Sequence, residues 1–192
     1  MNSACNSEEY FDVLNELGNK TGFTKPRSAV HRDGDWHRAV HIWIINDKGE
    51  ILLQRRAPDK DTHPNFWDIS VGGHSQAGDD PLTGAVREVK EEIGLDIPPT
   101  DFQLLLEHHS SEQPHPGFLN NSFYNSYIVR TDKTLADMTK QESEVAELKF
   151  VPFSEFKAMV ENHDSDLVPH PVDYDALIML LEPEFGEANE KP

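Results

Sequence analysis

The sequence contains little cysteine, few positive charges and no long apolar run. Its 192 residues include one cysteine, Cys5, so no internal disulfide can form, which fits a reducing, cytoplasmic setting. No apolar stretch of about 18 residues occurs, and we expect no membrane contact. Lysine and arginine number 17 against 35 acidic residues, giving a formal net charge of -18. This charge argues against nucleic-acid binding, because a polyphosphate would be repelled.

The length is that of one ordinary domain with short extensions. We expect an N-terminal helical extension over residues 1–24, a main domain over 25–182 and an acidic tail over 183–192. The apolar side chains of Tyr10, Phe11, Val13, Leu14 and Leu17 fit a short, loosely attached amphipathic helix. Residues 25–36 are rich in turn-forming types and predict a loop or hairpin.

The rest of the chain alternates between strand and helix patterns. Residues 39–45 and 51–56 predict a hairpin, and residues 67–71 predict a short strand before a glycine loop. Residues 102–109 and 118–129 predict two strands, separated by SSEQPHPG, which is too rich in proline for either element. A strand at 147–151 and helices at 154–162 and 173–181 follow. This order predicts an α/β fold.

Residues 81–93 predict a helix with two different faces. Asp79 or Asp80 can cap its start, Gly94 can end it, and no proline interrupts it. At about 100° per residue, its apolar side chains gather on one side, and three glutamates gather on the other. The glutamates are Glu88, Glu91 and Glu92.

Three carboxylates at this spacing repel one another, which costs a few tenths of a kcal/mol per pair on an exposed helix. A hard divalent cation such as Mg²⁺ or Mn²⁺ would offset the repulsion, since it prefers oxygen ligands. The alternative is a solvated acidic face, with Arg87 and Lys90 nearby.

The glycine loop and this helix together resemble the Nudix box. Gly73, five residues, Asp79, seven residues and then REVKEEIGL follow that motif, except that the family has Glu at the position of Asp79. The resemblance implies an α/β/α sandwich with a mixed sheet and the box helix packed on it. It also implies that Glu88, Glu91 and Glu92 bind the metal, that Arg87 orients them, and that the Gly72 carbonyl completes the site.

Residues 31–74 further resemble the Nudix subgroup that includes isopentenyl-diphosphate isomerase and related hydrolases. The isomerases have a catalytic cysteine where this chain has Gly72. They also have two glutamates where the best match places Asn120 and Ser122. The box, which the isomerases have lost in part, is complete here except at Asp79. The resemblance therefore favours a hydrolase.

The same subgroup suggests further site residues. Arg56 and Lys60 correspond to diphosphate contacts in the isomerases, and with Gly73 they form the predicted substrate-binding set; the alternative is that both cations are solvated. His31, His37 and His74 correspond to histidines that hold a second metal there, or they only shape the rim of the pocket. Glu144 resembles a catalytic loop glutamate of several Nudix hydrolases, or it is a solvent-facing charge.

The resemblance implies a Nudix pyrophosphohydrolase that cleaves a nucleoside diphosphate joined to a group X, with Mg²⁺ or Mn²⁺. We expect Glu91, Glu92, Arg87 and Glu144 to be catalytic, and a homodimer is a further expectation. Trp36, Trp67 and Phe123 are candidates to stack on a base, although strand aromatics more often pack in a core.

Two alternative functions differ from this hydrolase. One is an isopentenyl-diphosphate isomerase, which Gly72 disfavours. The other is a catalytically silent Nudix module that binds a nucleotide, which the three intact glutamates disfavour. The sequence identifies neither X nor the general base.

Overall fold

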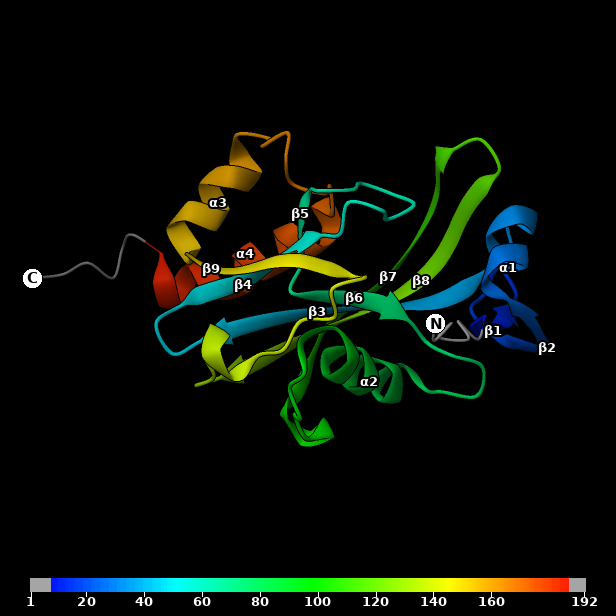
Figure 1. Cartoon of the computed structure of the whole chain (residues 1–192), viewed down its shortest axis with the longest axis horizontal. Coiled ribbons are helices and arrows are strands. Elements are labelled where there is room, and N and C mark those ends of the chain that lie inside the picture. The colour runs from blue at the N-terminus through cyan, green and yellow to red at the C-terminus, as the bar shows by residue number, and fades with distance from the viewer. Residues whose placement is uncertain (1–7, 187–192) are drawn as a thin grey trace, which may run out of the picture.

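A mixed β-sheet forms the centre of the structure, a computed structural model that describes residues 8–186 (Figure 1). Its central strand order is β5-β4-β3-β8-β7; β6 pairs with β3, and β9 pairs with β4. The β3–β8 pair is parallel and the other pairs are antiparallel. The strands are β3 (His37–Asn46), β4 (Glu50–Arg56), β5 (Trp67–Asp68), β6 (Val71–His74), β7 (Phe102–His115), β8 (Phe118–Thr131) and β9 (Val145–Pro152).

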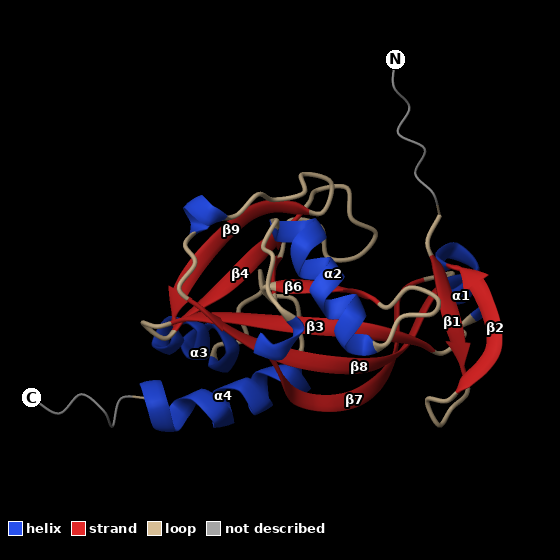
Figure 2. Cartoon of the chain, turned by 90° about the horizontal axis from the view of Figure 1, so that it is seen from below, coloured by secondary structure: helices blue, strands red, loops and turns tan. Residues whose placement is uncertain are grey.

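Helices cover both faces of this sheet, which confirms the predicted α/β/α sandwich (Figure 2). The box helix α2 (Pro81–Ile93) packs on Val40, Ile42 and Ile44 of β3 in one apolar cluster. Helices α3 (Phe153–Glu161) and α4 (Pro171–Phe185) pack on the opposite face, against Trp43 and Ile45. Two short 3-10 helices, η1 (Pro99–Asp101) and η2 (Leu135–Asp137), lie in the connections. Alternate residues of β3 thus contribute to two separate cores.

The predicted N-terminal helix is wrong. Residues 8–26 instead contain strands β1 (Tyr10–Leu14) and β2 (Lys20–Pro26), paired antiparallel. Phe11 and Val13 point inward with alternating period, whereas Leu17 is 82% exposed in the turn. The Asn15 side chain accepts hydrogen bonds from the backbone N–H groups of Leu17 and Asn19, which closes that turn. Five apolar residues in so short a stretch fit either period, and the packing of Phe11 selects the strand.

Residues 25–36, predicted as a loop or hairpin, contain a short helix, α1 (Arg27–Asp33). It ends at Gly34, whose φ of 72° is the left-handed conformation that glycine adopts readily. Because α1 follows β2 directly, it carries the side chains of Arg27 and His31 toward the main sheet.

The segment SSEQPHPG does not separate two short strands as predicted. β7 runs through it to His115, and β8 begins at Phe118 after a turn at Gly117, where φ is 85°. β7 is an edge strand, so Pro114 can lie in it without removing an interior hydrogen bond, and the register shifts there. The two strands extend as a long hairpin above the sheet (Figure 1).

The other predicted elements agree with the structure, with shifted ends. The hairpin β3–β4 is confirmed, and the single strand expected at 67–71 is two short strands, β5 and β6. Helix α4 continues through Pro183 to Phe185, so the expected acidic tail is helical at its start; residues 187–192 lie outside the described residues. No helix within residues 8–186 is long and apolar enough to cross a membrane.

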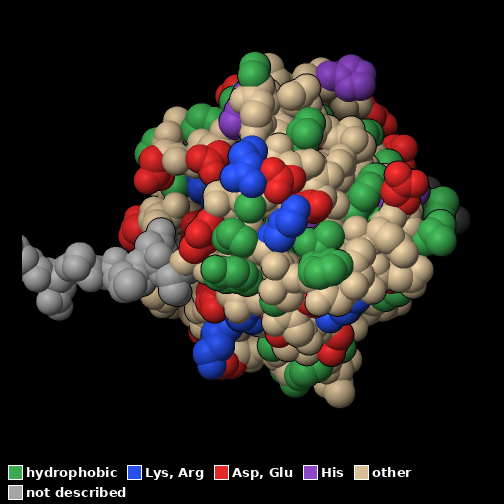
Figure 3. Space-filling model, turned by 90° about the vertical axis from the view of Figure 1, so that its right-hand side faces the viewer, with side chains coloured by type: hydrophobic (Ala, Val, Ile, Leu, Met, Phe, Trp, Pro, Cys, Tyr) green, Lys and Arg blue, Asp and Glu red, His purple; other side chains and the backbone are tan. Residues whose placement is uncertain are grey.

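The β1, β2 and α1 end of the molecule carries mixed charges. On this face, basic side chains are scattered among acidic and hydrophobic ones and do not form a continuous basic patch (Figure 3).

Candidate active site

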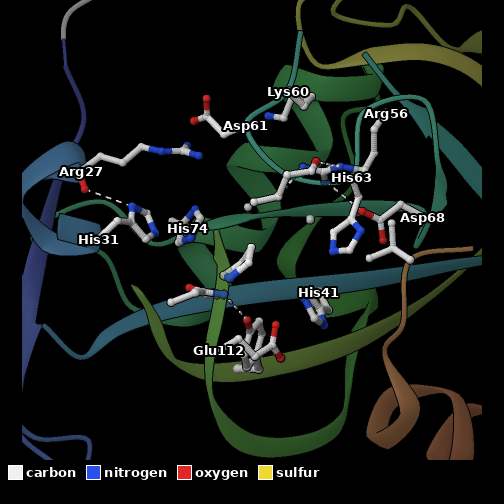
Figure 4. A pocket seen from close by; sticks show the side chains of 18 of the residues that line it. Arg27, His31, His41, Arg56, Lys60, Asp61, His63, Asp68, His74 and Glu112 are labelled. Carbon is white, nitrogen blue, oxygen red and sulfur yellow. Dashed lines mark hydrogen bonds and ion pairs between the residues drawn. The ribbon is translucent and has the colours of Figure 1, made fainter. Parts of the chain in front are cut away.

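A cavity of about 1410 Å³ lies where α2, β6, the loop after β4 and the start of α4 meet. Its lining includes residues from most parts of the chain, from Glu8 to Asp173. The close view shows cationic, acidic and imidazole side chains around one space (Figure 4). The space is large enough for a ligand bigger than a bare diphosphate.

Local sequence explains why α2 presents its glutamates to this cavity. Asp80 caps the helix by accepting a hydrogen bond of 2.9 Å from the Thr83 N–H, and Gly94 ends it with φ of 74°. Ala85, Val89 and Ile93 are fully buried against the sheet. The glutamates therefore face away from that core, and all three line the cavity: Glu88, Glu91 and Glu92.

Arg87 connects two glutamates of the box helix to the backbone of β6. Its guanidinium lies 3.0 Å from Glu88 Oε1 and 2.9 Å from Glu91 Oε2, and it donates at 2.8 Å to the carbonyl of His74. Asp79 is farther away, with 3.7 Å between its Oδ2 and Arg87 Nε, and that buried Nε has no hydrogen-bond partner among the described residues. The shorter side chain at position 79 thus leaves one donor of Arg87 unsatisfied.

Two of the three clustered glutamates are buried, and Arg87 pairs with Glu88 and Glu91. Glu88 is 8% exposed, and burial raises its pKa to about 7 despite the neighbouring Arg87. Glu92 is 5% exposed; burial and the charges of Glu88 and Glu144 raise its pKa well above the usual value. Burial is the largest cause of both shifts, and Arg87 offsets it only in part at Glu88. A divalent cation would reverse them, so the donor set fits one.

The glycines before the box leave room for this cluster. A Cβ atom on Gly73 would lie 2.2 Å from Glu88 Cδ, a separation that real structures do not allow. Gly72 precedes it on β6, where an added Cβ would meet Ile69 Cδ1 at 3.1 Å. The Glu88 carboxyl group therefore rests on the backbone of β6, and only glycine at position 73 permits this.

Lys60 and Glu144, predicted separately, are brought together as an ion pair at the cavity wall. Arg56 also lines the cavity, but its guanidinium already has partners (Figure 4). Its Nη1 bonds Asp68 Oδ2 at 2.9 Å, and its Nε donates to the carbonyl of Thr62 at 2.9 Å. Arg56 therefore closes the loop after β4, and its predicted contact with substrate would have to use the remaining N–H groups.

His31, His37 and His74 converge, with one ring nitrogen of each within 4.8 Å of the others. Burial lowers the pKa of His31 and of His37 to about 4 and holds that of His74 well below its usual value, so all three are neutral at pH 7 and able to bind a metal. Phe11 stacks on His37 and His74. A second metal here stays a prediction.

The two positions that hold glutamates in the isomerases have a different role in this chain. Ser122 Oγ lies 3.1 Å from His37 Nε2 and donates at 2.8 Å to Asn120 Oδ1. Since His37 Nδ1 also lies 3.1 Å from the Asp35 carbonyl oxygen, both ring nitrogens of His37 have protein partners, and no carboxylate is supplied from β8.

The aromatic residues predicted to stack on a base do not line the cavity: Trp36, Trp67 and Phe123. Trp36 and Phe123 instead pack on each other, with ring centroids 5.0 Å apart, and Lys149 lies over Trp67. The alternative given for these side chains, that they pack against other residues of the protein, agrees with the structure.

Several cavity residues were missed by reasoning from the sequence. Arg27 on α1 points into the cavity near Lys60 (Figure 4). His41 lies on β3 two positions beyond Ala39 and four beyond His37, so the alternation along one strand face could have identified it. Its partner Asp173 is 132 residues away, and no local pattern joins them.

Comparison with known proteins places this geometry in context. Nudix hydrolase 3 of Arabidopsis thaliana is 42% identical over 170 residues, which are 86% of this chain and 22% of that protein. The chain thus spans less than a quarter of this relative's length. An uncharacterised Nudix hydrolase of Listeria monocytogenes is 34% identical over 79% of this chain and 84% of its own. An isopentenyl-diphosphate isomerase of Paenarthrobacter aurescens is 29% identical over 97% of this chain and 96% of its own.

Among solved structures, the DR0079 protein of Deinococcus radiodurans superposes with a TM-score of 0.64. It is 22% identical and covers 88% of this chain and 98% of its own, so the likeness concerns the fold. The family model of the NUDIX domain matches residues 35–170, which include the box. With this match over most of its length, the chain belongs to the Nudix family.

Proposed function

We propose that this chain hydrolyses a diphosphate linkage in a nucleoside diphosphate joined to a group X, using Mg²⁺ or Mn²⁺. The observation that supports this most is the placement of Glu88, Glu91 and Glu92 on the wall of one large cavity. Two of them are buried with raised pKa values, an arrangement that gains from a divalent cation. The family of hydrolases to which the relatives belong agrees with this reaction.

Each residue has a separate role in the proposed reaction. Glu88, Glu91 and Glu92, with the Gly72 carbonyl, would hold the cation, which supplies positive charge to the phosphates and makes a water more acidic. Arg87 holds Glu88 and Glu91 in position through its ion pairs. The glycine at 73 lets Glu88 approach the backbone.

Charged side chains near the box would bind the diphosphate and accept the proton. Lys60 and Arg27 line the cavity and would neutralise phosphate oxygens, and Arg56 would add a contact from its loop. Glu144 would accept the proton from water once the phosphate attracts Lys60 away from it. A cytoplasmic homodimer remains an expectation, which light scattering would test.

The proposal is tested by phosphate release after a coupled phosphatase, with Mg²⁺ or Mn²⁺ and a panel of nucleotide derivatives. The panel contains nucleoside diphosphate sugars, dinucleoside polyphosphates, coenzymes and free nucleotides. Glu91→Gln and Glu92→Gln should each reduce turnover by several orders of magnitude, because each removes a charged cation ligand. The control is Glu155→Gln, an exposed position on α3, which should retain full activity.

Two outcomes would contradict the proposal. If nucleotide binding persisted and neither glutamate variant changed turnover, the chain would be a silent binding module. If incubation with isopentenyl diphosphate and Mg²⁺ gave the dimethylallyl isomer, it would be an isomerase, as some relatives are.

A further inference from the structure

The cavity has a second end that the box chemistry does not use. Five polar residues line it, and we call them the His–Asp cluster: His41, Asp68, His108, His170 and Asp173. They come from β3, β5, β7 and the start of α4, and so are brought together only by the fold. In the close view, His41 and Asp68 lie away from His31 and His74 (Figure 4).

Two buried carboxylates fix the orientation of the imidazole rings. Asp173 is 1% exposed; its Oδ1 lies 3.2 Å from His41 Nδ1, and its Oδ2 lies 3.5 Å from His108 Nε2. Asp68 is 4% exposed; its Oδ1 lies 2.8 Å from His170 Nε2, and its Oδ2 pairs with Arg56. Each carboxylate is fully bonded, so the rings are held in place before any ligand arrives.

Each of the three rings has a second nitrogen without a partner in residues 8–186, and that of His108, Nδ1, is fully buried. Among the described residues, no hydrogen bond reaches His41 Nε2 or His170 Nδ1, although both side chains line the cavity and His41 is 6% exposed. With Nδ1–H donated to Asp173, His41 Nε2 is an acceptor in the neutral ring. The charge of Asp68 outweighs burial and raises the pKa of His170, which favours a protonated ring with Nδ1–H as a donor.

The charges in the cluster already compensate one another. The two negative charges of Asp68 and Asp173 are matched by two positive ones, on Arg56 and on the protonated ring of His170. A charged group on a ligand would therefore find no unpaired opposite charge in the cluster. An apolar tail would leave an acceptor and a donor buried without partners, at a cost of about 1–3 kcal/mol for each group. A hydroxyl group can both donate and accept, and it suits this pair.

The two ends of the cavity lie on opposite faces of β6. A Cβ on Gly73 would collide with the Glu88 carboxyl group, whereas a Cβ on the adjacent Gly72 would lie 3.9 Å from His41 Cδ2. Among the described strands, β6 pairs only with β3, so no strand pairs with its other edge. A ligand with its diphosphate at the box can therefore extend over this edge to His41 and His170.

We propose that the His–Asp cluster binds the group X, and that X carries hydroxyl groups, as a sugar does. This proposal rests on the proposed hydrolysis and adds the chemical class of X to it. His41 and His170 contact the hydroxyl groups, and Asp68 and Asp173 position the two rings.

The test compares substrates that differ only in the hydroxyl groups of X. ADP-glucose and UDP-glucose are each compared with the ethyl ester of the same nucleoside diphosphate, and kcat/KM is measured with Mg²⁺. His41→Asn keeps an amide nitrogen where Nδ1 meets Asp173 and removes Nε2. His170→Gln keeps an amide nitrogen where Nε2 meets Asp68 and removes Nδ1. His163→Asn, at an exposed site outside the cavity, is the matched control.

The wild type should prefer the glucose compound, and each cavity variant should reduce that preference about tenfold, as expected for one hydrogen bond. The control should preserve it, and unchanged melting temperatures should exclude misfolding. Equal kcat/KM for the two kinds of X, or a preference that both variants retain, would overturn the proposal. If the wild type cleaves no compound of the whole nucleotide panel, the proposed hydrolysis fails; calorimetric binding of the glucose compound and the ethyl ester then decides the subsite by the same comparison.

Discussion

At the scale of single residues, the candidate site depends on how close side chains come to one another. Arg87 touches Glu88, Glu91 and the carbonyl of His74, and only its contact with Asp79 is longer than a hydrogen bond. That deviation coincides with the one position at which the box differs from its family. The structure therefore shows a physical effect of the difference: one buried guanidinium donor is unsatisfied.

Replacing Asp79 with glutamate should repair this contact. The extra methylene would bring the carboxylate within hydrogen-bonding distance of Arg87 Nε, now 3.7 Å away. Since both side chains are partly exposed, we expect a gain of about 0.5–1 kcal/mol, seen as a higher melting temperature. Asp96→Glu lengthens an exposed carboxylate paired with Lys90 and should give no gain. A melting temperature for the Asp79 variant at or below that of the wild type would contradict this account.

Gly73→Ala should displace Glu88, because its Cβ would lie 2.2 Å from the Glu88 Cδ atom. We expect Mn²⁺ affinity to fall about tenfold or more, as measured by calorimetry, since one proposed ligand is moved. Gly72→Ala meets only the flexible end of Ile69 at 3.1 Å and should lose less. Equal affinities for the two variants would argue against the close packing of Glu88 on β6.

At the scale of elements, the first N-terminal strand packs against the candidate site. Phe11 of β1 is fully buried, and its ring stacks on His37 at 5.5 Å and on His74 at 4.9 Å between centroids. β1 also contacts β3 and so supports the strand that lines the cavity floor. The first strand thus packs firmly on the histidine cluster. The expectation of a loosely attached segment is wrong.

Phe11→Ala should destabilise the whole protein by about 3–5 kcal/mol, the usual cost of removing a buried phenyl ring. The control is Phe23→Ala on β2, which is 71% exposed and should change the free energy of unfolding by less than about 0.5 kcal/mol. Urea unfolding measures both. If the two variants were equally stable, residues 10–26 would not be integral to the fold.

The sequence predicted those elements whose signals are local. The box helix has its cap, its stop and its periodicity within 15 residues, so Asp80 and Gly94 define it without help from the rest of the chain. Residues 10–14 carry no such signals, and the choice of strand depends on distant contacts of Phe11. Likewise, the acidic half of the site was readable from the motif, whereas the pairing of His41 with Asp173 exists only after folding.

At the scale of the whole molecule, buried ion pairs join the last helix to the sheet. Asp173 at the start of α4 contacts His41 on β3, His108 on β7 and Ser126 on β8. Burial alone would raise its pKa, but its contact with His41 and its hydrogen bond from Ser126 outweigh this and hold the pKa below the usual 3.8. One carboxylate thus connects α4 to three strands of the sheet.

This pair gives a pH dependence of stability with a defined direction. Because the pKa of Asp173 is lowered on folding, its contribution is present above about pH 4 and is lost as the pH falls below that value. Asp173→Asn should reduce the free energy of unfolding at pH 7 by about 3 kcal/mol. The difference from the wild type should narrow in acid.

Asp175→Asn, two residues further along α4 and exposed, is the matched control and should stay within about 0.5 kcal/mol of the wild type. Chemical denaturation at pH 7, 5 and 3.5 checks both variants. If the difference in the free energy of unfolding between the Asp173 variant and the wild type grew in acid, the lowered pKa of Asp173 would be contradicted.

The alternation along β3 has a consequence for changes in chain length. Its even-numbered residues Val40, Ile42 and Ile44 pack under α2, while odd-numbered positions supply Ala39 and His41 to the cavity and Trp43 to the other core. Deleting one residue from the start of this strand would reverse every side chain between the deletion and Asn46. Ile42 would then face the cavity, and His41 would enter the apolar layer. Substitutions can be tolerated here one at a time, but the spacing of the strand cannot change.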